Sequence, residues 1–401
     1  MLRHLAASAV AALVILPGTP AQADEIRDQT APVMRSMNVP RAWELSKGSG
    51  VTVAVLDSGV DPAQADLTGS VTLGPDYTEG ANPAGVEPKR LHGTNMASII
   101  AGHGHGAGGA DGVMGVAPQA RLLALRVIVE NDEPGYSEFI NDMRYEDTIA
   151  RGIRYAVDNG ADVVNLSLGR SSATKAEREA VAYALSKNVV VVAAAGNAGA
   201  TDKARRSGHA PFSYPASFPG VISVAAVDEK GAHAGFSNRN SSVVVSAPGV
   251  RIIGAGPGDQ YWIGDGTSPA TAFVSGVAAL IRSRHPGLAP ALVTQAIVTG
   301  TRHRPAGGYD LGVGFGAIDA HAALTESDRL AAARRIGLGL PATQHFADGD
   351  GGDAGRIRVV HRDGRLIVTS ATIATLALAV LVFSLVMALR RRPQSEADPQ
   401  P

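Results

Sequence analysis

The chain has 401 residues, with 36 basic and 37 acidic side chains and a formal net charge of −1. Hydrophobic residues make up 45% of it and charged residues 18%, so it can bury a core and is not disordered as a whole. The near-neutral charge and the 4% of aromatic residues argue against a nucleic-acid-binding protein. The absence of cysteine excludes disulfides, thiolate metal sites and cysteine nucleophiles.

Residues 1–23 are typical of a secretory signal peptide. A basic start at Arg3 precedes an almost wholly apolar run over 5–16, and residues 21–23 (Ala-Gln-Ala) form a small-x-small cleavage site. The apolar run is shorter than the roughly 20 residues that a membrane-spanning helix needs. We therefore expect an exported protein, with a retained N-terminal anchor as the alternative, followed by a short polar extension over 24–40.

Between residues 41 and 325, short apolar runs rich in β-branched residues alternate with segments of helical length. Runs without a polar face are typical of buried parallel strands. The alternation predicts an α/β domain, a three-layer αβα sandwich with a mostly parallel central sheet. The expected strands cover residues 51–56, 121–129, 163–168, 189–195, 221–227 and 243–246, and the expected helices include 145–159 and 175–188.

Three short segments carry side chains suited to nucleophilic catalysis, in the order Asp, His, Ser. Asp57 ends an apolar strand and precedes Ser-Gly, which places it at the carboxyl edge of the sheet. His92 opens a segment whose apolar residues have helical spacing, and Ser268 follows a glycine-rich turn at the start of another helix. Each residue alone is typical of a turn or a helix cap, but the combination in this order is specific.

The chemistry of acyl transfer needs these residue types together. A serine hydroxyl needs a base at neutral pH, and a buried carboxylate orients the histidine that serves as that base. The oxyanion that develops needs donors already in place. Asn197 supplies one candidate, because an apolar strand ends in Gly196-Asn197, and the backbone N–H of Ser268 supplies another. An esterase of the α/β-hydrolase type does not fit, because its serine precedes the acid and the histidine.

Residues 41–323 resemble the catalytic domain of the subtilisin-like serine proteases, the subtilases of peptidase family S8. The resemblance implies that Asp57 orients the base, His92 is the base, Ser268 is the nucleophile and Asn197 is an oxyanion donor. The similar segments are Val-Leu-Asp57-Ser-Gly, His92-Gly-Thr, Ala-Ala-Gly-Asn197, Phe236-Ser-Asn238, Ser246-Ala-Pro-Gly249, Gly-Thr-Ser268 and residues 312–324.

The same resemblance implies where a substrate would bind. Ser167, Leu168 and Gly169 would wall the primary pocket and, together with Gly196, hold a protein or peptide substrate as an added extended strand. One residue near the nucleophile departs from the family pattern. The family usually has a proline four residues after the serine, whereas here Pro269 follows Ser268 directly. A proline at the first position of a helix is tolerated, so we expect an unchanged helix start.

Two segments invite a metal site, and neither supports one. His103 and His105 are two residues apart in a glycine-rich run, 102–115, without a carboxylate pattern to complete a zinc site. We expect that run to form a mobile loop beside the active site. Residues 348–353 faintly resemble a calcium loop, but Gly352 takes a ligand position and no closing glutamate follows. We assign no metal and no cofactor.

The C-terminal part of the chain predicts a membrane anchor. A linker over 326–365 leads to residues 366–389, which carry no charge and are long enough to cross a bilayer as a helix. Three arginines begin the tail at 390–401, as expected for a stop-transfer flank. With the signal peptide, this predicts a single-pass cell-membrane protein, with an extracytoplasmic catalytic domain and a short cytoplasmic tail.

The order of segments also resembles the mycosins, the membrane-anchored subtilases of bacterial type VII secretion systems. Too few residues precede the first strand for the usual subtilase pro-domain, as in that group. The absence of cysteine departs from the mycosin pattern. The sequence therefore predicts a membrane-anchored serine endopeptidase that associates with type VII secretion. The alternative is a weakly active or inactive relative that serves as a structural subunit of a membrane complex.

Overall fold

The computed structural model describes residues 23–335 and 364–390. The chain divides into two compact units, one ending at Gly337 and the other beginning at Leu338. Of the predicted signal peptide only Ala23 is described, and most of the predicted tail lies outside the described residues.

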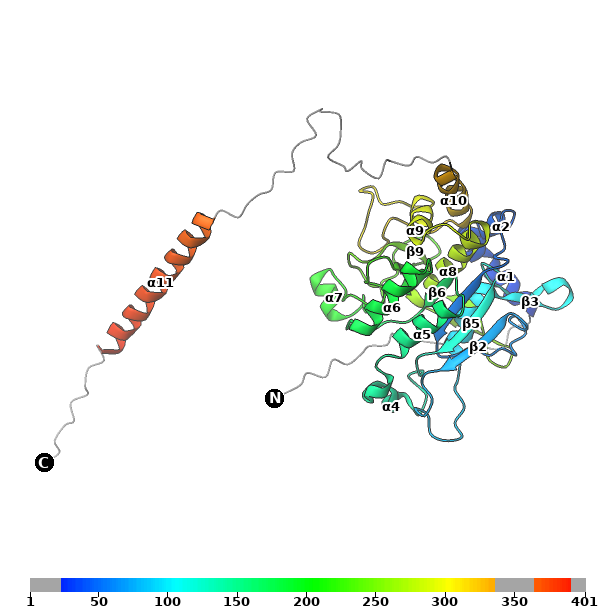
Figure 1. Cartoon of the computed structure of the whole chain (residues 1–401), viewed down its shortest axis with the longest axis horizontal. Coiled ribbons are helices and arrows are strands. Elements are labelled where there is room, and N and C mark those ends of the chain that lie inside the picture. Colours follow the sequence, from blue (N-terminus) through cyan, green and yellow to red (C-terminus); the bar gives the residue numbers. More distant parts are fainter. Residues whose placement is uncertain (1–22, 336–363, 391–401) are drawn as a thin grey trace. The chain divides into compact units, whose positions relative to one another are not determined.

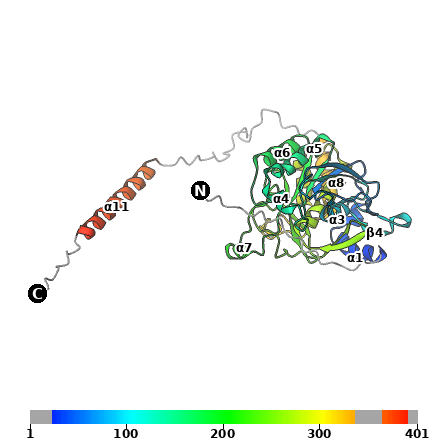
Figure 2. The same cartoon turned by 90° about the horizontal axis from the view of Figure 1, so that it is seen from below.

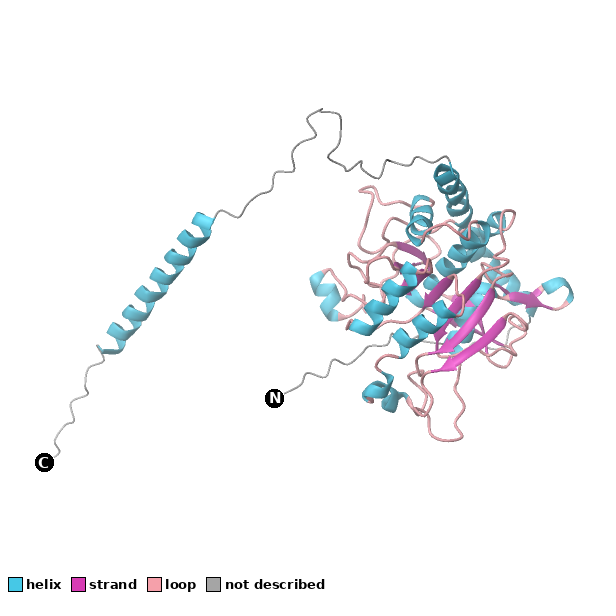
Figure 3. Ribbon diagram, viewed as in Figure 1, coloured by secondary structure: helices cyan, strands magenta, loops and turns pink. Residues whose placement is uncertain are grey.

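A seven-stranded parallel sheet is the centre of the first unit (Figures 1 and 3). Each of the six predicted runs overlaps one of its strands, and the predicted α/β fold with a parallel sheet is confirmed. In spatial order the strands are β2 (Val71–Asp76), β5 (Arg121–Arg126), β1 (Thr52–Asp57), β6 (Val163–Leu166), β7 (Val190–Ala194), β8 (Ile222–Val227) and β9 (Val245–Pro248). Strand β2 was missed because, as an edge strand, it is half exposed and contains Pro75.

Helices cover both faces of the sheet, and the alternation of side chains along β1 explains why. Val53 and Val55 belong to the core shared with α3 (Leu91–Ala101), α8 (Thr267–Arg284) and α9 (Pro290–Thr299). Ala54 and Leu56 belong to the core shared with α5 (Thr148–Asp158) and α6 (Lys175–Ser186) on the other face (Figure 2). Successive strand residues point to opposite faces, so a run that is apolar at every position needs both layers.

The remaining elements of this unit are short or peripheral. Two small antiparallel hairpins lie outside the main sheet. The elements are β3 (His103–His105), β4 (Asp111–Met114), β10 (Ile252–Gly256), β11 (Gln260–Gly264), α1 (Ala23–Ser36), α2 (Val39–Ala42), α4 (Tyr136–Asn141), α7 (Asp202–Ser207), α10 (Ala320–Arg335) and the 3-10 turns Ala107–Gly109 and Met143–Tyr145.

The predicted extension over 24–40 is part of the first unit rather than a separate polar segment. It forms α1 and α2, and Ile26, Thr30, Met34 and Met37 are buried. These residues recur at intervals of three or four, which gives a helix one apolar stripe. The stripe was overlooked because the polar residues between its members dominate the composition.

The C-terminal boundary of this unit also differs from the prediction. The linker was expected over 326–365, but α10 continues to Arg335. Its residues Ser327 and Leu330 are buried, and the Asp328 carboxylate accepts a hydrogen bond from Arg284 Nε of α8 at 2.6 Å. These contacts hold the last turns of α10 against the core, so the folded unit extends past residue 325.

The glycine-rich run 102–115 forms the β3–β4 hairpin rather than a loop beside the active site. The guanidinium group of Arg27 in α1 donates to the carbonyl oxygens of Gly109, Asp111 and Gly112 at 2.8, 3.0 and 3.0 Å. His105 Nδ1 lies 2.6 Å from a carboxylate oxygen of the buried Asp66. A cation on α1 and an anion from the body of the domain therefore hold the hairpin.

The second unit contains α11 (Gly364–Arg390), a helix of 27 residues that includes the predicted span 366–389. Among the described residues, no helix combines the length and the apolar character needed to cross a membrane.

Loss of the Arg27 clamp should destabilise the domain. We expect Arg27→Ala to lower the free energy of unfolding by about 2 kcal/mol, because hydrogen bonds from a charged group to three carbonyls disappear together. Urea unfolding followed by circular dichroism measures this change. Arg35→Ala is the matched control, since Arg35 is exposed on the same helix. Equal stability of the two variants would contradict a stabilising clamp.

Candidate active site

Three neighbouring strands end at one edge of the sheet and deliver polar residues there. Asp57 is the last residue of β1, Ser167 follows β6, and Asn197 lies just beyond β7. Because parallel strands share one direction, their carboxyl ends meet at the same edge, where α/β proteins place their sites. The structure therefore brings these three predicted site residues together, although they lie far apart in the sequence.

His92 reaches Asp57 because α3 begins very close to the end of β1. A Cβ atom on Gly93 would lie 2.0 Å from the carbonyl oxygen of Gly59, so only glycine fits beside His92. This close approach brings His92 Nδ1 to 2.6 Å from Asp57 Oδ1, which also accepts the Ser58 N–H at 2.7 Å. Asp57 is fully buried, and the short contact orients the imidazole, whose Nε2 makes no hydrogen bond within the described part of the chain.

The charges around His92 favour its protonated form. Burial by itself lowers the pKa of the imidazole, but the Asp57 charge and hydrogen bond, with a smaller effect from the charge of Glu130, raise it. The net pKa of His92 is above its usual value. An imidazole of raised basicity can accept a proton from a hydroxyl and stabilise the imidazolium that results.

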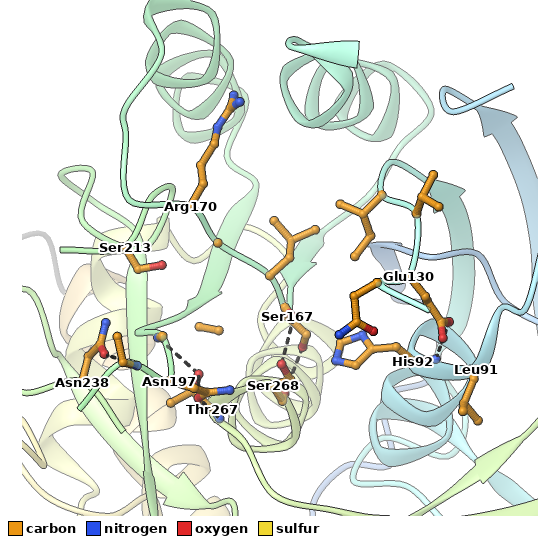
Figure 4. A pocket seen from close by; sticks show the side chains of 18 of the residues that line it. Leu91, His92, Glu130, Ser167, Arg170, Asn197, Ser213, Asn238, Thr267 and Ser268 are labelled. Carbon is orange, nitrogen blue, oxygen red and sulfur yellow. Dashed lines mark hydrogen bonds between the residues drawn. The ribbon is translucent and has the colours of Figure 1, made fainter. Parts of the chain in front are cut away.

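Ser268 lies in the first turn of α8 and faces the same cavity as His92. Figure 4 shows it between Asn197 on one side and His92 on the other, and the cavity has a volume of about 790 Å³. Its hydroxyl donates to the carbonyl oxygen of Ser167 at 2.9 Å, and no hydrogen bond to His92 is present among the described residues. The hydroxyl must turn away from Ser167 before His92 can take its proton.

Asn197 is held by the residue that precedes the serine. Its Oδ1 accepts the backbone N–H and the hydroxyl of Thr267, each at 2.9 Å. The Thr267 hydroxyl in turn accepts the Gly196 N–H at 3.2 Å. With its oxygen occupied in this way, Asn197 has Nδ2 left as a donor beside Ser268, which suits a developing oxyanion.

Asn238 fixes the backbone on both sides of Asn197. Its Nδ2 donates to the carbonyl oxygens of Ala195 at 2.7 Å and Pro211 at 3.0 Å, and its Oδ1 accepts the Ala198 N–H at 2.8 Å. Its own N–H donates to the Gly196 carbonyl oxygen at 2.9 Å. Sequence reasoning noted the segment around Asn238 but gave this side chain no role, because its partners are distant in the sequence.

The walls of the cavity include all the predicted substrate-binding residues. Ser167, Leu168, Gly169 and Gly196 all line it. Ser213, which sequence reasoning missed, lines it too and packs against Gly169: a Cβ atom on Gly169 would lie 2.2 Å from the Ser213 hydroxyl oxygen. Glycine at 169 therefore leaves room for the Ser213 side chain.

Pro269 does not displace the start of α8, but it occupies a later position in the helix than the sequence predicted. The helix begins at Thr267, so Pro269 is its third residue rather than its first. The N–H groups of the first turn have no partner within a helix, so the missing proline N–H removes no helical hydrogen bond.

The two histidines considered as metal ligands have other partners. His103 contacts the carbonyl oxygens of Gly104 and Thr68, and His105 contacts Asp66. No cluster of three or more metal-ligating side chains occurs in the part of the chain that the structure describes.

The parallel sheet, with an Asp–His pair beside a serine, has the arrangement found in hydrolases with a serine nucleophile. The profile of the subtilase family matches residues 48–316. Thermitase of Thermoactinomyces vulgaris is 38% identical over 250 residues, which cover 62% of this chain and 81% of thermitase. Subtilisin E of Bacillus subtilis (strain 168) is 39% identical over 241 residues. The chain belongs to the subtilase family.

The extent of these similarities differs between relatives. The match to subtilisin E covers 60% of this chain and 57% of that protein, so the chain spans little more than half of its length. Among solved structures, the MycP3 protease from the type VII (ESX-3) secretion system has a TM-score of 0.60 and 32% identity, covering 79% of this chain and 93% of MycP3. Fervidolysin from Fervidobacterium pennivorans has a TM-score of 0.62 and 29% identity, covering 73% of this chain and 45% of that one.

Removal of the Asn238 side chain should disturb the oxyanion segment. We expect Asn238→Ala to slow the reaction of Ser268 with a fluorophosphonate at least about tenfold, because loss of one oxyanion donor slows acyl transfer about 10²–10³-fold and here the donor is only misplaced. Labelling rates on folded protein measure this. Asn240→Ala is the control, because Asn240 also binds the Pro211 carbonyl oxygen but makes no described contact with the Asn197 segment. Equal rates for both variants would contradict the positioning role.

Proposed function

We propose that the chain is an extracytoplasmic serine endopeptidase that hydrolyses peptide bonds through an acyl-enzyme. The observation that carries the proposal is the buried 2.6 Å contact between Asp57 and His92 at the cavity that also contains Ser268. The similarity to thermitase and subtilisin E supports it.

The first half of the reaction forms the acyl-enzyme. His92 Nε2 takes the proton of the Ser268 hydroxyl as Oγ attacks the carbonyl carbon of the scissile bond. Asp57 stabilises the imidazolium, and Asn197 Nδ2 with the Ser268 N–H donates to the oxyanion. His92 then gives its proton to the departing amine as the C–N bond breaks.

The second half releases the product. A water molecule gives a proton to His92 and attacks the acyl carbon, and the ester bond to Ser268 breaks as the proton returns to Oγ. The free acid leaves, and the enzyme is regenerated. A substrate bound in extended form beside residues 167–169 would present its carbonyl group to the serine, because backbone pairing fixes its direction.

Replacement of Ser268 tests this function. Ser268→Ala should reduce hydrolysis of a peptide library by at least about 10⁴-fold and abolish fluorophosphonate labelling, because the attacking oxygen is gone. Ser283→Ala is the control, since Ser283 lies on the same helix with its hydroxyl bonded to the Ser49 carbonyl oxygen. Thermal unfolding of both variants should match that of the unchanged chain. Persistent hydrolysis by Ser268→Ala would refute the assignment.

We also propose that the protease works with a type VII secretion system. The support is its similarity to MycP3 and to MycP1 of Mycobacterium smegmatis, which is 27% identical with a TM-score of 0.60 over 79% of this chain. The structural-subunit alternative is distinguished by the same variant. If Ser268→Ala fully restores secretion to a strain that lacks the chain, the structural role is favoured. If Ser268→Ala restores assembly of the secretion complex but not cleavage of its substrate, both roles are supported.

Residues 366–389 are proposed as the membrane anchor, on the strength of their sequence. They carry no charge, three arginines follow them, and exposed side chains such as Leu378 and Phe383 lie along α11. An uncharged and mostly apolar stretch of this length suits the interior of a bilayer.

Truncation tests the anchor. We expect the full chain to stay in the membrane fraction after alkaline carbonate extraction, and a chain ending at residue 363 to be released, because it lacks the apolar helix. A protease added outside intact cells should remove the catalytic domain and spare the tail. Release of the full chain by carbonate would contradict the proposal.

A further inference from the structure

Glu130 is a carboxylate in the cavity that the proposed mechanism does not use. It lies just beyond β5, on the segment that runs past the end of β1, and it lines the cavity next to His92. Its Oε1 accepts the backbone N–H of His92 at 2.9 Å (Figure 4). Two carboxylates therefore act on one histidine, Asp57 at the imidazole and Glu130 at the main chain.

We propose that Glu130 is a positioning residue that holds the start of α3 and places a negative charge next to His92. This proposal rests on the proposed protease function. Glu130 is not among the site residues predicted from the sequence. Its first support is geometric. His92 is the second residue of α3, and the N–H groups of a first helical turn need an acceptor from outside the helix. A carboxylate there also interacts favourably with the helix dipole.

The segment around Glu130 is held so that the carboxylate cannot easily move away. The Glu130 N–H donates to Glu133 Oε1 at 3.0 Å. Glu133 is buried and accepts hydrogen bonds from Arg126 at 2.9 Å and from Asn82 at 2.6 Å. The charge of Glu133 is thus paired with Arg126, and its contact with the main chain orients Glu130 toward α3.

Nearby cations are paired with other acids. Lys89 forms an ion pair with Asp132, and Arg90 lies 3.8 Å from Glu87. Arg126 forms ion pairs with Glu133 and Asp76. No ion pair to Glu130 occurs within the described ranges 23–335 and 364–390.

Without a paired cation, the charge of Glu130 acts mainly on the imidazole and on Asp57. Burial, and to a smaller extent the charge of Asp57, raises the pKa of the Glu130 carboxyl above its usual value. Hydrogen bonds from the His92 N–H and the Ser58 hydroxyl, together with the charge of His92, oppose this rise. In the other direction, the Glu130 charge raises the pKa of His92. The ionised Glu130 carboxylate therefore stabilises the protonated imidazole of His92.

The charge and the hydrogen bond can be separated by an isosteric change. Glu130→Gln keeps an oxygen that can accept the His92 N–H and removes only the negative charge. We expect the acid limb of kcat/KM against pH to move to lower pH, because the loss of a neighbouring anion lowers the pKa of His92. Glu130→Ala should show this shift together with a lower thermal midpoint, because it also loses the helix acceptor.

The control removes a negative charge from the segment that leads into α3, at a residue with no described contact to His92. Glu87→Gln fits, because Glu87 is exposed and its nearest described cation is Arg90. Its acid limb should coincide with that of the unchanged chain. A limb for Glu130→Gln that coincides with the unchanged chain, or an equal shift in Glu87→Gln, would overturn the proposal.

A second readout does not depend on hydrolysis. The full chain, labelled with ¹⁵N-histidine in detergent, allows the His92 imidazole to be titrated by NMR, with His92→Gln identifying its signals. The titration midpoint should fall in Glu130→Gln by the same amount as the acid limb. If the unchanged chain proves inactive, the proposed protease function fails while this titration still decides whether Glu130 acts on His92.

Discussion

The contact between Asp57 and His92 depends on a backbone approach that few sequences allow. The Asp57 carboxylate is fully buried, and a buried charge is strongly unfavourable unless hydrogen bonds surround it. Its Oδ1 lies 2.7 Å from the Ser58 N and 2.6 Å from His92 Nδ1, and the second contact depends on Gly93, where a Cβ atom would lie 2.0 Å from the Gly59 carbonyl oxygen. The end of β1 and the start of α3 therefore form one structural unit, to which α8 adds the nucleophile and the segment after β7 adds the oxyanion donor.

Most of the site residues that sequence reasoning missed lack the local signal that marked Asp57 and Asn197. Asp57 ends an apolar strand and Asn197 lies just beyond one, so sheet topology alone brings them to one edge. Glu130 carries a similar signal, because it directly follows the predicted apolar run 121–129, but sequence reasoning gave it no role. Asn238 and Ser213 carry none. Each acts on a segment far away in the sequence, through contacts that exist only after the strands and helices have packed. Spacing and periodicity carry no information about contacts of this kind.

The boundaries of the catalytic unit were harder to predict than its centre. The strands β1, β6 and β7 are buried on both faces, so every residue contributes to the pattern. Helices at the rim bury a single stripe, as α1 does, and their remaining residues have the composition of a linker. The same reasoning explains α10, whose polar residues include Asp328 in an ion pair with α8.

The start of α8 shows why a departure beside the nucleophile changes so little. Ser268 and Ser167 exchange hydrogen bonds, each hydroxyl donating to the other's carbonyl oxygen at 2.9 Å. Thr267 binds Asn197 beyond β7, and the Gly266 N–H donates to Gly249 beyond β9 at 2.8 Å. Three strand ends thus hold this turn from outside the helix. Because Pro269 removes only an N–H that the first turn of a helix does not use, these outer contacts determine the position of Ser268.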